Sequence, residues 1–229
     1  MGKDGQPKHR QEARELRRHA ARRQPADRLL IVCEGEKTEP LYLNEIRQEL
    51  RLPSANIQVQ PTAYGTEPLR IVEYAEDLFM SGNRERGILP RSFDRVIAVF
   101  DRDSHHTYHA AIAKAASLNE RITNDEGVKV PFEPVVSVPC FELWPLLHFE
   151  DVLAPIERGD VYQRLQQHLP GYAKGQASLW AMTKPQLDDA TARAKALIAA
   201  GGHAHHGQLP FTEMHTLVDQ LRHLKDRAA

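Results

Sequence analysis

Three short runs of mostly apolar residues stand out in the sequence, at positions 29–33, 96–100 and 135–138. Runs of this length are typical of strands that are buried on both faces, as in a parallel sheet. Residues 56–60 alternate apolar and polar side chains and predict a further strand. The pattern therefore predicts a central sheet whose strands lie far apart in the sequence.

Between and after these runs, apolar residues recur at helical spacing. Helices are expected at residues 40–50, 69–79, 107–118, 141–149, 161–168, 184–200 and 212–224. Strands that alternate with helices form α/β folds, so we expect a mostly parallel sheet flanked by helices. The predicted organisation is a basic N-terminal arm at 1–27, an α/β core at 28–150 and a helical C-terminal extension at 151–229 that packs on the core.

The composition fits one globular core with an appendage. The chain has 229 residues, of which 41% are hydrophobic and 27% are charged, as is ordinary for a soluble globular protein. No apolar run approaches the roughly 18 to 20 residues that cross a bilayer, and the N-terminus lacks the apolar core of a secretory signal. Cys33 and Cys140 suit a reducing compartment. These features predict a cytoplasmic protein without a membrane partner.

The formal net charge of −1 conceals an excess of positive charge at the N-terminus. Residues 1–28 contain nine Lys or Arg and four Asp or Glu. On a helix, four of the arginines would form one stripe: Arg14, Arg17, Arg18 and Arg22. Such a stripe contacts nucleic-acid phosphates or docks an acidic partner, and a solvated, frayed helix accounts for it equally well.

Acidic residues follow three of the predicted strands. Glu34 comes directly after the first strand. Asp101 and Asp103 follow a later one, and Glu142 lies a turn beyond the last. Because ligands bind beyond the carboxyl ends of parallel strands, these residues are expected at one edge of the sheet. In extended backbone alternate residues point the same way, so Asp101 and Asp103 would share a site while the residue between them turns aside.

A divalent metal ion would explain such a cluster. Carboxylates without a cation repel one another, and some of them would be forced to hold protons. Mg²⁺ prefers oxygen ligands and takes one or two carboxylates together with water and substrate phosphate. Each motif alone is common on protein surfaces, so it is their conjunction that predicts a site for Mg²⁺ or Mn²⁺.

The same motifs resemble a known family. Glu34 before a glycine, with Asp101 and Asp103 after a later strand, is similar to the signature of the Toprim fold of primases, topoisomerases and overcoming-lysogenization-defect nucleases. The following segments, in this order, resemble the RloB family: residues 32–40 (VCEGEKTEP), 99–103 (VFDRD), 139–144 (PCFELW) and 147–149 (LHF). The similarity spans about residues 28–225.

The resemblance implies a Toprim-like fold and a metal-dependent nuclease in defence against phage. RloB proteins resemble the abortive-infection protein AbiLii and are often found beside an ATPase partner. Glu34 would be the general acid/base or the first metal ligand, and Asp101 and Asp103 would be metal ligands. Glu142 is predicted as a further ligand, with the alternative that it stabilises the start of a helix through the helix dipole. Pro145 is tolerated in a first turn, so that helix can begin later than Cys140.

Two lysines are further candidates for the catalytic site. Lys37 lies three residues after Glu34, where it would contact a scissile phosphate or pair with an acid, and pairing is favoured. Lys174 belongs to a pattern also found in RloB-like chains. It would stabilise charge in a phosphoryl-transfer transition state, with a solvated loop as the favoured alternative. Glu36 and Glu39 would extend the metal shell, although three acids in six residues more often form a wet loop.

The histidines are weaker candidates. A polar turn is favoured for His105 and His106 over an acid/base or metal-binding role. His148 is expected in the core or at its boundary. Surface positions in a Gly-rich loop are expected for His203, His205 and His206.

These observations predict a hydrolase of phosphodiester bonds in DNA or RNA. The alternative is a catalytically quiet sensor or scaffold subunit for an ATPase partner. Nucleotidyl transfer, as in Toprim primases, is less favoured because no template-binding zinc module or large polymerase body is evident. Nucleic acid is the expected partner, and a homo-oligomer is compatible with the sequence.

Overall fold

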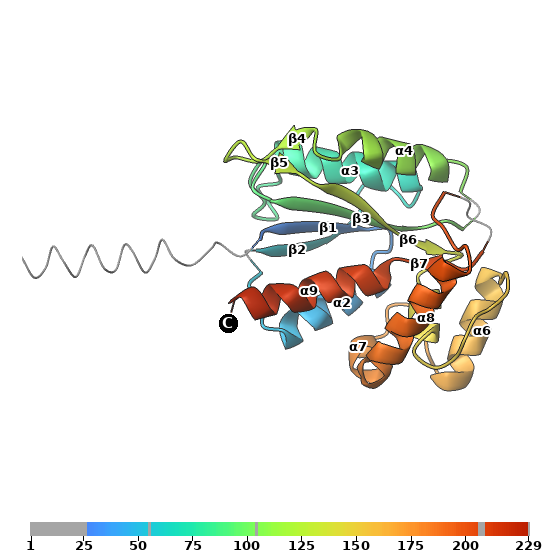
Figure 1. The fold of residues 1–229 in the computed structure, drawn as a ribbon. Coiled ribbons are helices and arrows are strands. Elements are labelled where there is room, and N and C mark those ends of the chain that lie inside the picture. The colour runs from blue at the N-terminus through green and yellow to red at the C-terminus, as the bar shows by residue number, and fades with distance from the viewer. Residues whose placement is uncertain (1–26, 55, 104, 206–208, 229) are drawn as a thin grey trace, which may run out of the picture.

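The computed structural model describes residues 27–54, 56–103, 105–205 and 209–228, and its centre is a five-stranded sheet (Figure 1). In spatial order the strands are β2 (Ile57–Pro61), β1 (Leu29–Cys33), β3 (Arg95–Asp101), β6 (Phe132–Val138) and β7 (Phe211–Thr212). The first four are parallel, and β7 is antiparallel to β6. The expectation of a mostly parallel α/β sheet flanked by helices is confirmed.

Helices cover both faces of the sheet. One face carries α3 (Pro68–Ser81) and α4 (Tyr108–Leu118), and the other carries α2 (Thr38–Glu49) and α9 (Met214–Ala228) (Figure 1). The remaining helices gather on the α2–α9 side, beside the carboxyl ends of the strands: α5 (Leu143–Leu146), α6 (Arg158–His168), α7 (Leu179–Thr183), the 3₁₀ helix η1 (Lys184–Gln186) and α8 (Leu187–Ala199).

The alternation of side chains along the strands divides the interior into two cores. In β1, Leu30 and Val32 pack with the α3–α4 layer, while Ile31 and Cys33 pack with the opposite layer. Successive strand residues point to opposite faces, so a strand covered on both faces must be apolar at every position. This is the reason that the apolar runs of the sequence predict the strands correctly.

The segment after β6 differs from its prediction. A helix was expected over 141–149, but α5 is a single turn, Leu143–Leu146. Pro145 cannot donate a backbone hydrogen bond, and the turns on both sides of it contain three-residue contacts, such as that from the N–H of His148 to the carbonyl of Pro145 (3.2 Å). The short elements β4 (Ile122–Thr123), β5 (Lys129–Val130), β7 and α7 were not predicted.

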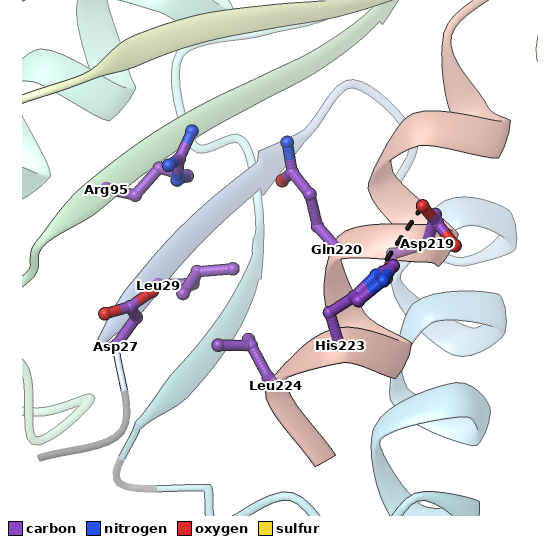
Figure 2. Close-up of a pocket in the computed structure, with 7 residues that line it drawn as sticks. All are labelled: Asp27, Leu29, Arg95, Asp219, Gln220, His223 and Leu224. Carbon is purple, nitrogen blue, oxygen red and sulfur yellow. Dashed lines mark hydrogen bonds and ion pairs between the residues drawn. The ribbon is translucent and has the colours of Figure 1, made fainter. Parts of the chain in front are cut away.

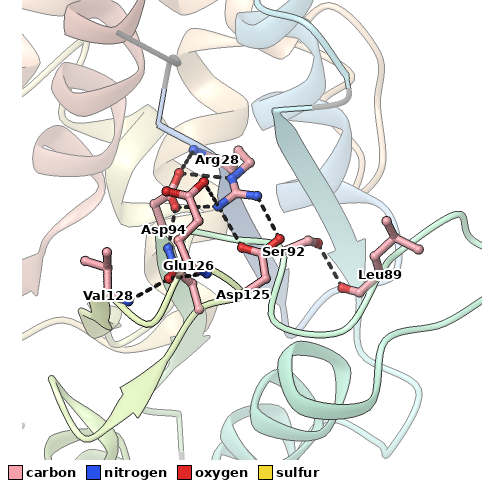
Figure 3. Close-up of polar contacts among 8 residues, drawn as sticks. Arg28, Leu89, Ser92, Asp94, Asp125, Glu126 and Val128 are labelled. Carbon is pink, nitrogen blue, oxygen red and sulfur yellow. Dashed lines mark hydrogen bonds and ion pairs between the residues drawn. The ribbon is translucent and has the colours of Figure 1, made fainter.

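At the amino ends of the strands, Arg28 binds a group of acidic residues (Figure 3). Its Nη2 lies 2.8 Å from Oδ1 of Asp94 and 3.0 Å from Oδ1 of Asp125, and Glu126 lies 3.6 Å away. Asp94 also accepts a hydrogen bond of 2.9 Å from the side chain of Asn124. These contacts join the start of β1 to the start of β3 and to the loop between β4 and β5.

The predicted division into arm, core and extension stays a prediction. Almost all of the arm, residues 1–26, lies outside the described residues. Within the described ranges, none of the helices combines the length and the apolar character that a membrane crossing requires.

Candidate metal site

The carboxylates that follow β1, β3 and β6 lie at one edge of the sheet. Glu34, Asp101 and Glu142 line the same cleft, of about 270 Å³. Asp103 lines an adjoining cleft of about 540 Å³, to which Glu34 also contributes. The sheet order places β1, β3 and β6 side by side, and parallel strands end at the same edge. The four predicted carboxylates are therefore gathered around two connected clefts.

Glu34 is fixed by the strand next to it. Its backbone N–H donates to the carbonyl of Val99 (2.9 Å), which continues the ladder between β1 and β3 by one residue. Its Oε2 accepts a hydrogen bond of 2.9 Å from the N–H of Asp101. With 9% of its surface exposed, Glu34 is held in a defined orientation at the mouth of the cleft.

Asp103 reaches its position in a different way from the one predicted. The strand ends at Asp101, and Asp103 has a φ of 37°, a left-handed conformation that Asp tolerates better than most residues. Its N–H donates to the carbonyl of Pro139 (3.0 Å). The alternation expected for extended backbone therefore does not apply, and Arg102 lines the same cleft as Asp103 instead of turning aside.

Glu39 is buried in the cluster, and the expectation of a wet loop is wrong for this residue. Its side chain is only 6% exposed, and Oε2 has no hydrogen-bond partner among the described residues. Gly35 leaves room for it, since a Cβ at that position would lie 1.9 Å from Oε2 of Glu39. The helix α2 begins at Thr38, so the side chain of Glu39 folds back from the first turn. Glu36 is exposed, as expected of a loop residue.

The cluster contains more negative charge than its surroundings favour. Burial, followed by the charges of Glu142 and Glu34, raises the pKa of Glu39 to about 7. Burial and the charge of Glu34 raise the pKa of Asp101 well above its ordinary value. Burial likewise raises the pKa of Glu34, although the N–H of Asp101 opposes the shift. Protonation or a bound cation relieves such a cluster, so the residues present fit a divalent metal ion.

Two cationic side chains contact the cluster from other segments, and a third lies at the rim of the cleft. Arg158, from the first turn of α6, forms an ion pair with Asp103. Lys174 is exposed in a loop, as favoured from the sequence, and its Nζ lies 3.2 Å from Oε1 of Glu142. Lys37, for which pairing was favoured, is exposed at the rim of the cleft and forms no ion pair with a described residue.

His105 also lies in the site, although a polar turn was favoured for it over a metal-binding role. Its Nε2 lies 3.7 Å from Oε1 of Glu34, and its Nδ1 lies 3.5 Å from Oε1 of Glu67. Ligand atoms of Glu34, Asp103 and His105 all lie within 4.8 Å of one another, so these three residues could hold a metal ion. Two carboxylates suit a hard cation such as Mg²⁺, and the imidazole also suits softer transition-metal ions.

Three other histidines singled out in the sequence, His148, His203 and His205, lie outside this cluster. His148 is 1% exposed and its Nδ1 lies 2.9 Å from the carbonyl of Trp144, which confirms a core position. His203 and His205 are exposed and stack on each other, as expected of surface residues. His206 lies outside the described residues.

A separate hollow of about 230 Å³ lies at the amino edge of the sheet, against α9 (Figure 2). Its lining consists of Asp27, Leu29, Arg95, Asp219, Gln220, His223 and Leu224. Arg95 pairs with Glu133, and His223 lies 3.5 Å from Asp219. The charges there are of mixed sign and partly paired with each other, so the carboxyl edge is the stronger candidate for chemistry.

A family model described as RloB-like protein matches residues 29–221, which is most of the chain and includes every carboxylate of the cluster. No curated protein and no solved structure gives a significant match.

Proposed function

The chain belongs to the RloB-like protein family, and we propose that it is a divalent-metal-dependent hydrolase of phosphodiester bonds in nucleic acid that acts in defence against phage. One observation supports this most directly. Four buried carboxylates, of Glu34, Glu39, Asp101 and Glu142, face one cleft, and three of them have a raised pKa. Groups in this state at the mouth of a cleft are typical of functional sites.

The residues divide naturally between two roles. Asp101 and Asp103, with Glu142 and His105 beside them, would hold the metal ion. When bound, a Mg²⁺ or Mn²⁺ ion would neutralise charge on a phosphate and lower the pKa of a water molecule. We assign proton transfer to Glu34, because its Oε2 is engaged by the N–H of Asp101 and its Oε1 faces His105. A carboxylate with a raised pKa is a better proton acceptor near neutral pH than an ordinary one.

Metal binding and cleavage are tested with the same set of proteins. Calorimetric titration with Mn²⁺ and Mg²⁺ is expected to show binding by the parent protein. Cleavage of single-stranded and double-stranded DNA and of RNA should fall by more than about hundredfold in Glu34→Gln and in Asp101→Asn. The matched control is Glu36→Gln, which removes an exposed acid from the same loop and should retain activity.

Two outcomes would count against the proposal. Glu34→Gln and Asp101→Asn proteins that cleave as well as the parent would exclude this cluster as the active site. If millimolar Mg²⁺ and Mn²⁺ fail to bind, the alternative of a catalytically quiet sensor or scaffold subunit is favoured instead.

The role in defence is supported by family membership alone and has its own test. Cells that express the gene together with its neighbours are expected to survive or restrict phage infection better than cells carrying Asp101→Asn. Kinship with RloB proteins supports an ATPase as the partner, so the neighbouring gene is the first candidate for co-purification. Equal phage sensitivity of both strains would contradict the defence role without affecting the hydrolase.

A further inference from the structure

The two clefts at the carboxyl edge share three residues: Glu34, Thr66 and Arg158. Because of these shared walls the clefts form one groove, and Arg158 lies where they meet. We infer that Arg158 is a substrate-binding residue, whose guanidinium pairs with Asp103 in the metal-free protein and binds a nucleic-acid phosphate once a metal ion occupies the cluster. This inference rests on the proposed function and adds the group that binds the substrate.

The surroundings of Arg158 leave much of its hydrogen-bonding capacity free. A guanidinium has five N–H donors. Arg158 contacts a single carboxylate, that of Asp103, among the described residues, and 48% of its side chain is exposed. Arg28 provides the contrast, since it contacts Asp94, Asp125 and Glu126 and is 23% exposed. The N–H donors of Arg28 are therefore occupied by carboxylates of the fold, whereas Arg158 has N–H donors left for a ligand in the groove.

The partner of Arg158 is the reason to expect a change upon metal binding. Asp103 supplies one of the three clustered ligand atoms that could hold a metal ion. A divalent cation at Asp103 would compensate its charge and repel the guanidinium, which weakens the ion pair. A phosphate in the groove would then be the best available partner, because its oxygens match the planar fork of Arg in a bidentate arrangement.

The position of Arg158 suits a chain of nucleotides better than a single phosphate group. Lys37 and Lys174 line the groove on one side of it, and Arg102 lines the groove on the other. Contacts of this kind bind the sugar–phosphate backbone without reading the bases. Arg158 itself lies in the first turn of the eleven-residue helix α6, so its backbone is held by regular structure.

The test measures binding, not cleavage. Fluorescence anisotropy would report the affinity for a labelled single-stranded DNA and for an RNA of the same sequence, with Ca²⁺ as the ion, since Ca²⁺ also takes oxygen ligands. Arg158→Ala is expected to lower the affinity roughly tenfold. It should also reduce the slope of log affinity against log salt concentration by about 0.7, the value for one contact to a single strand. The affinity of Arg158→Lys should lie between that of the parent and that of Arg158→Ala.

The control lies on the same helix. Arg164 pairs with Glu150 and does not line the groove, so Arg164→Ala should leave the affinity and the salt slope unchanged. Calorimetry with Mn²⁺ is the second readout. The metal affinity of Arg158→Ala is expected to stay equal or to increase, because Asp103 loses a competing partner.

The outcomes separate this inference from the proposed function. An Arg158→Ala protein that binds the oligonucleotides with the parent's affinity and salt slope overturns the role of Arg158, while cleavage by the parent would still support the hydrolase. If the parent never cleaves but Arg158→Ala loses binding, the hydrolase fails and the role of Arg158 stands. No binding by the parent to either oligonucleotide overturns the role of Arg158 as well.

Discussion

Strand β3 has an aspartate at each end, and the two are in opposite electrostatic environments. Asp94 precedes the strand and accepts hydrogen bonds from Arg28 and Asn124. Partial burial alone would raise its pKa, but these hydrogen bonds outweigh burial and lower the pKa of Asp94 below its ordinary value. Asp101 ends the strand, and burial together with the charges of Glu34, Glu39 and Glu142 raises its pKa well above the ordinary value.

The difference indicates that the charged residues have different roles at the two edges of the sheet. At the amino edge the negative charges surround a cation, so charge there stabilises the fold. At the carboxyl edge buried carboxylates outnumber the cations in contact with them, so charge there lowers stability until a ligand compensates it. Residues that weaken the folded state without an evident structural reason are expected at functional sites. Ligands bind beyond the carboxyl ends of parallel strands, which explains why the functional site lies at the carboxyl edge.

The sharpest test of this comparison makes the same substitution at both ends of β3. In the presence of a chelator at neutral pH, we expect Asp94→Asn to lower the free energy of unfolding by about 1 to 2 kcal/mol, because Arg28 loses a charged acceptor. We expect Asp101→Asn to raise it by about 1 kcal/mol, because one negative charge leaves the cluster. Urea denaturation measures both, and the two variants should differ by about 2 to 3 kcal/mol.

The sign of the Asp101 effect decides the interpretation. A loss of stability in both variants would mean that the carboxylate of Asp101 is a structural group like that of Asp94. Removal of Arg28 gives a separate check on the amino edge, since Arg28→Ala should destabilise the protein about as much as Asp94→Asn does.

Metal binding should distinguish the two edges a second time. A ligand that binds only the folded protein stabilises it by about 2.7 kcal/mol at a concentration one hundred times its dissociation constant. We expect Mn²⁺ to give a stabilisation of this order in the parent and in Asp94→Asn, and little or none in Asp101→Asn. Thermal or urea unfolding with and without Mn²⁺ measures it. Equal stabilisation of all three proteins would place the ion somewhere else.

The sheet and four of its carboxylates could be predicted because both depend on local sequence. A strand segment covered on both faces is mostly apolar, and β1 and the interior of β3, residues 96–100, consist of such positions. Residues that directly follow parallel strands must lie at one edge, so the spacing of Glu34, Asp101 and Asp103 was informative. No knowledge of side-chain packing was needed for either conclusion.

The remaining members of the site depend on side-chain contacts that the sequence pattern does not reveal. Arg158 meets Asp103 across 55 positions of sequence, and nothing in its own neighbourhood indicates that contact. Glu39 is buried because Gly35 leaves space for its side chain, a relation that three acids in six residues do not reveal. The spacing of Gly35 and Glu39 around a helix start is the one local signal that could have identified it.

Glu213 allows two effects on the pKa of a carboxylate to be separated: that of burial and that of neighbouring carboxylates. It precedes α9 directly, and its Oε2 accepts a hydrogen bond of 3.0 Å from the N–H of Val136. Burial, with a smaller contribution from Glu133, raises the pKa of Glu213 to about 7. The carboxylates of the metal cluster do not contribute to this shift, so Glu213 is a half-buried acid with a raised pKa outside the cluster.

The sign of its effect on stability follows from proton binding. The ordinary pKa of a glutamate is 4.5, so between this pH and about 7 the folded protein binds the proton more tightly than the unfolded chain. The contribution of Glu213 to stability is therefore fully present at low pH and is lost as the pH rises through this window.

Glu213→Gln keeps an acceptor for the N–H of Val136 and should remove a pH dependence of the unfolding free energy of at most about 1.4 kcal/mol per pH unit. Urea unfolding across the window, with chelator and with Mn²⁺, should show the same Glu213 contribution in both, because burial and not the cluster sets its pKa. A contribution that disappears with Mn²⁺ would instead connect Glu213 to the metal site and remove the distinction between buried and clustered acids.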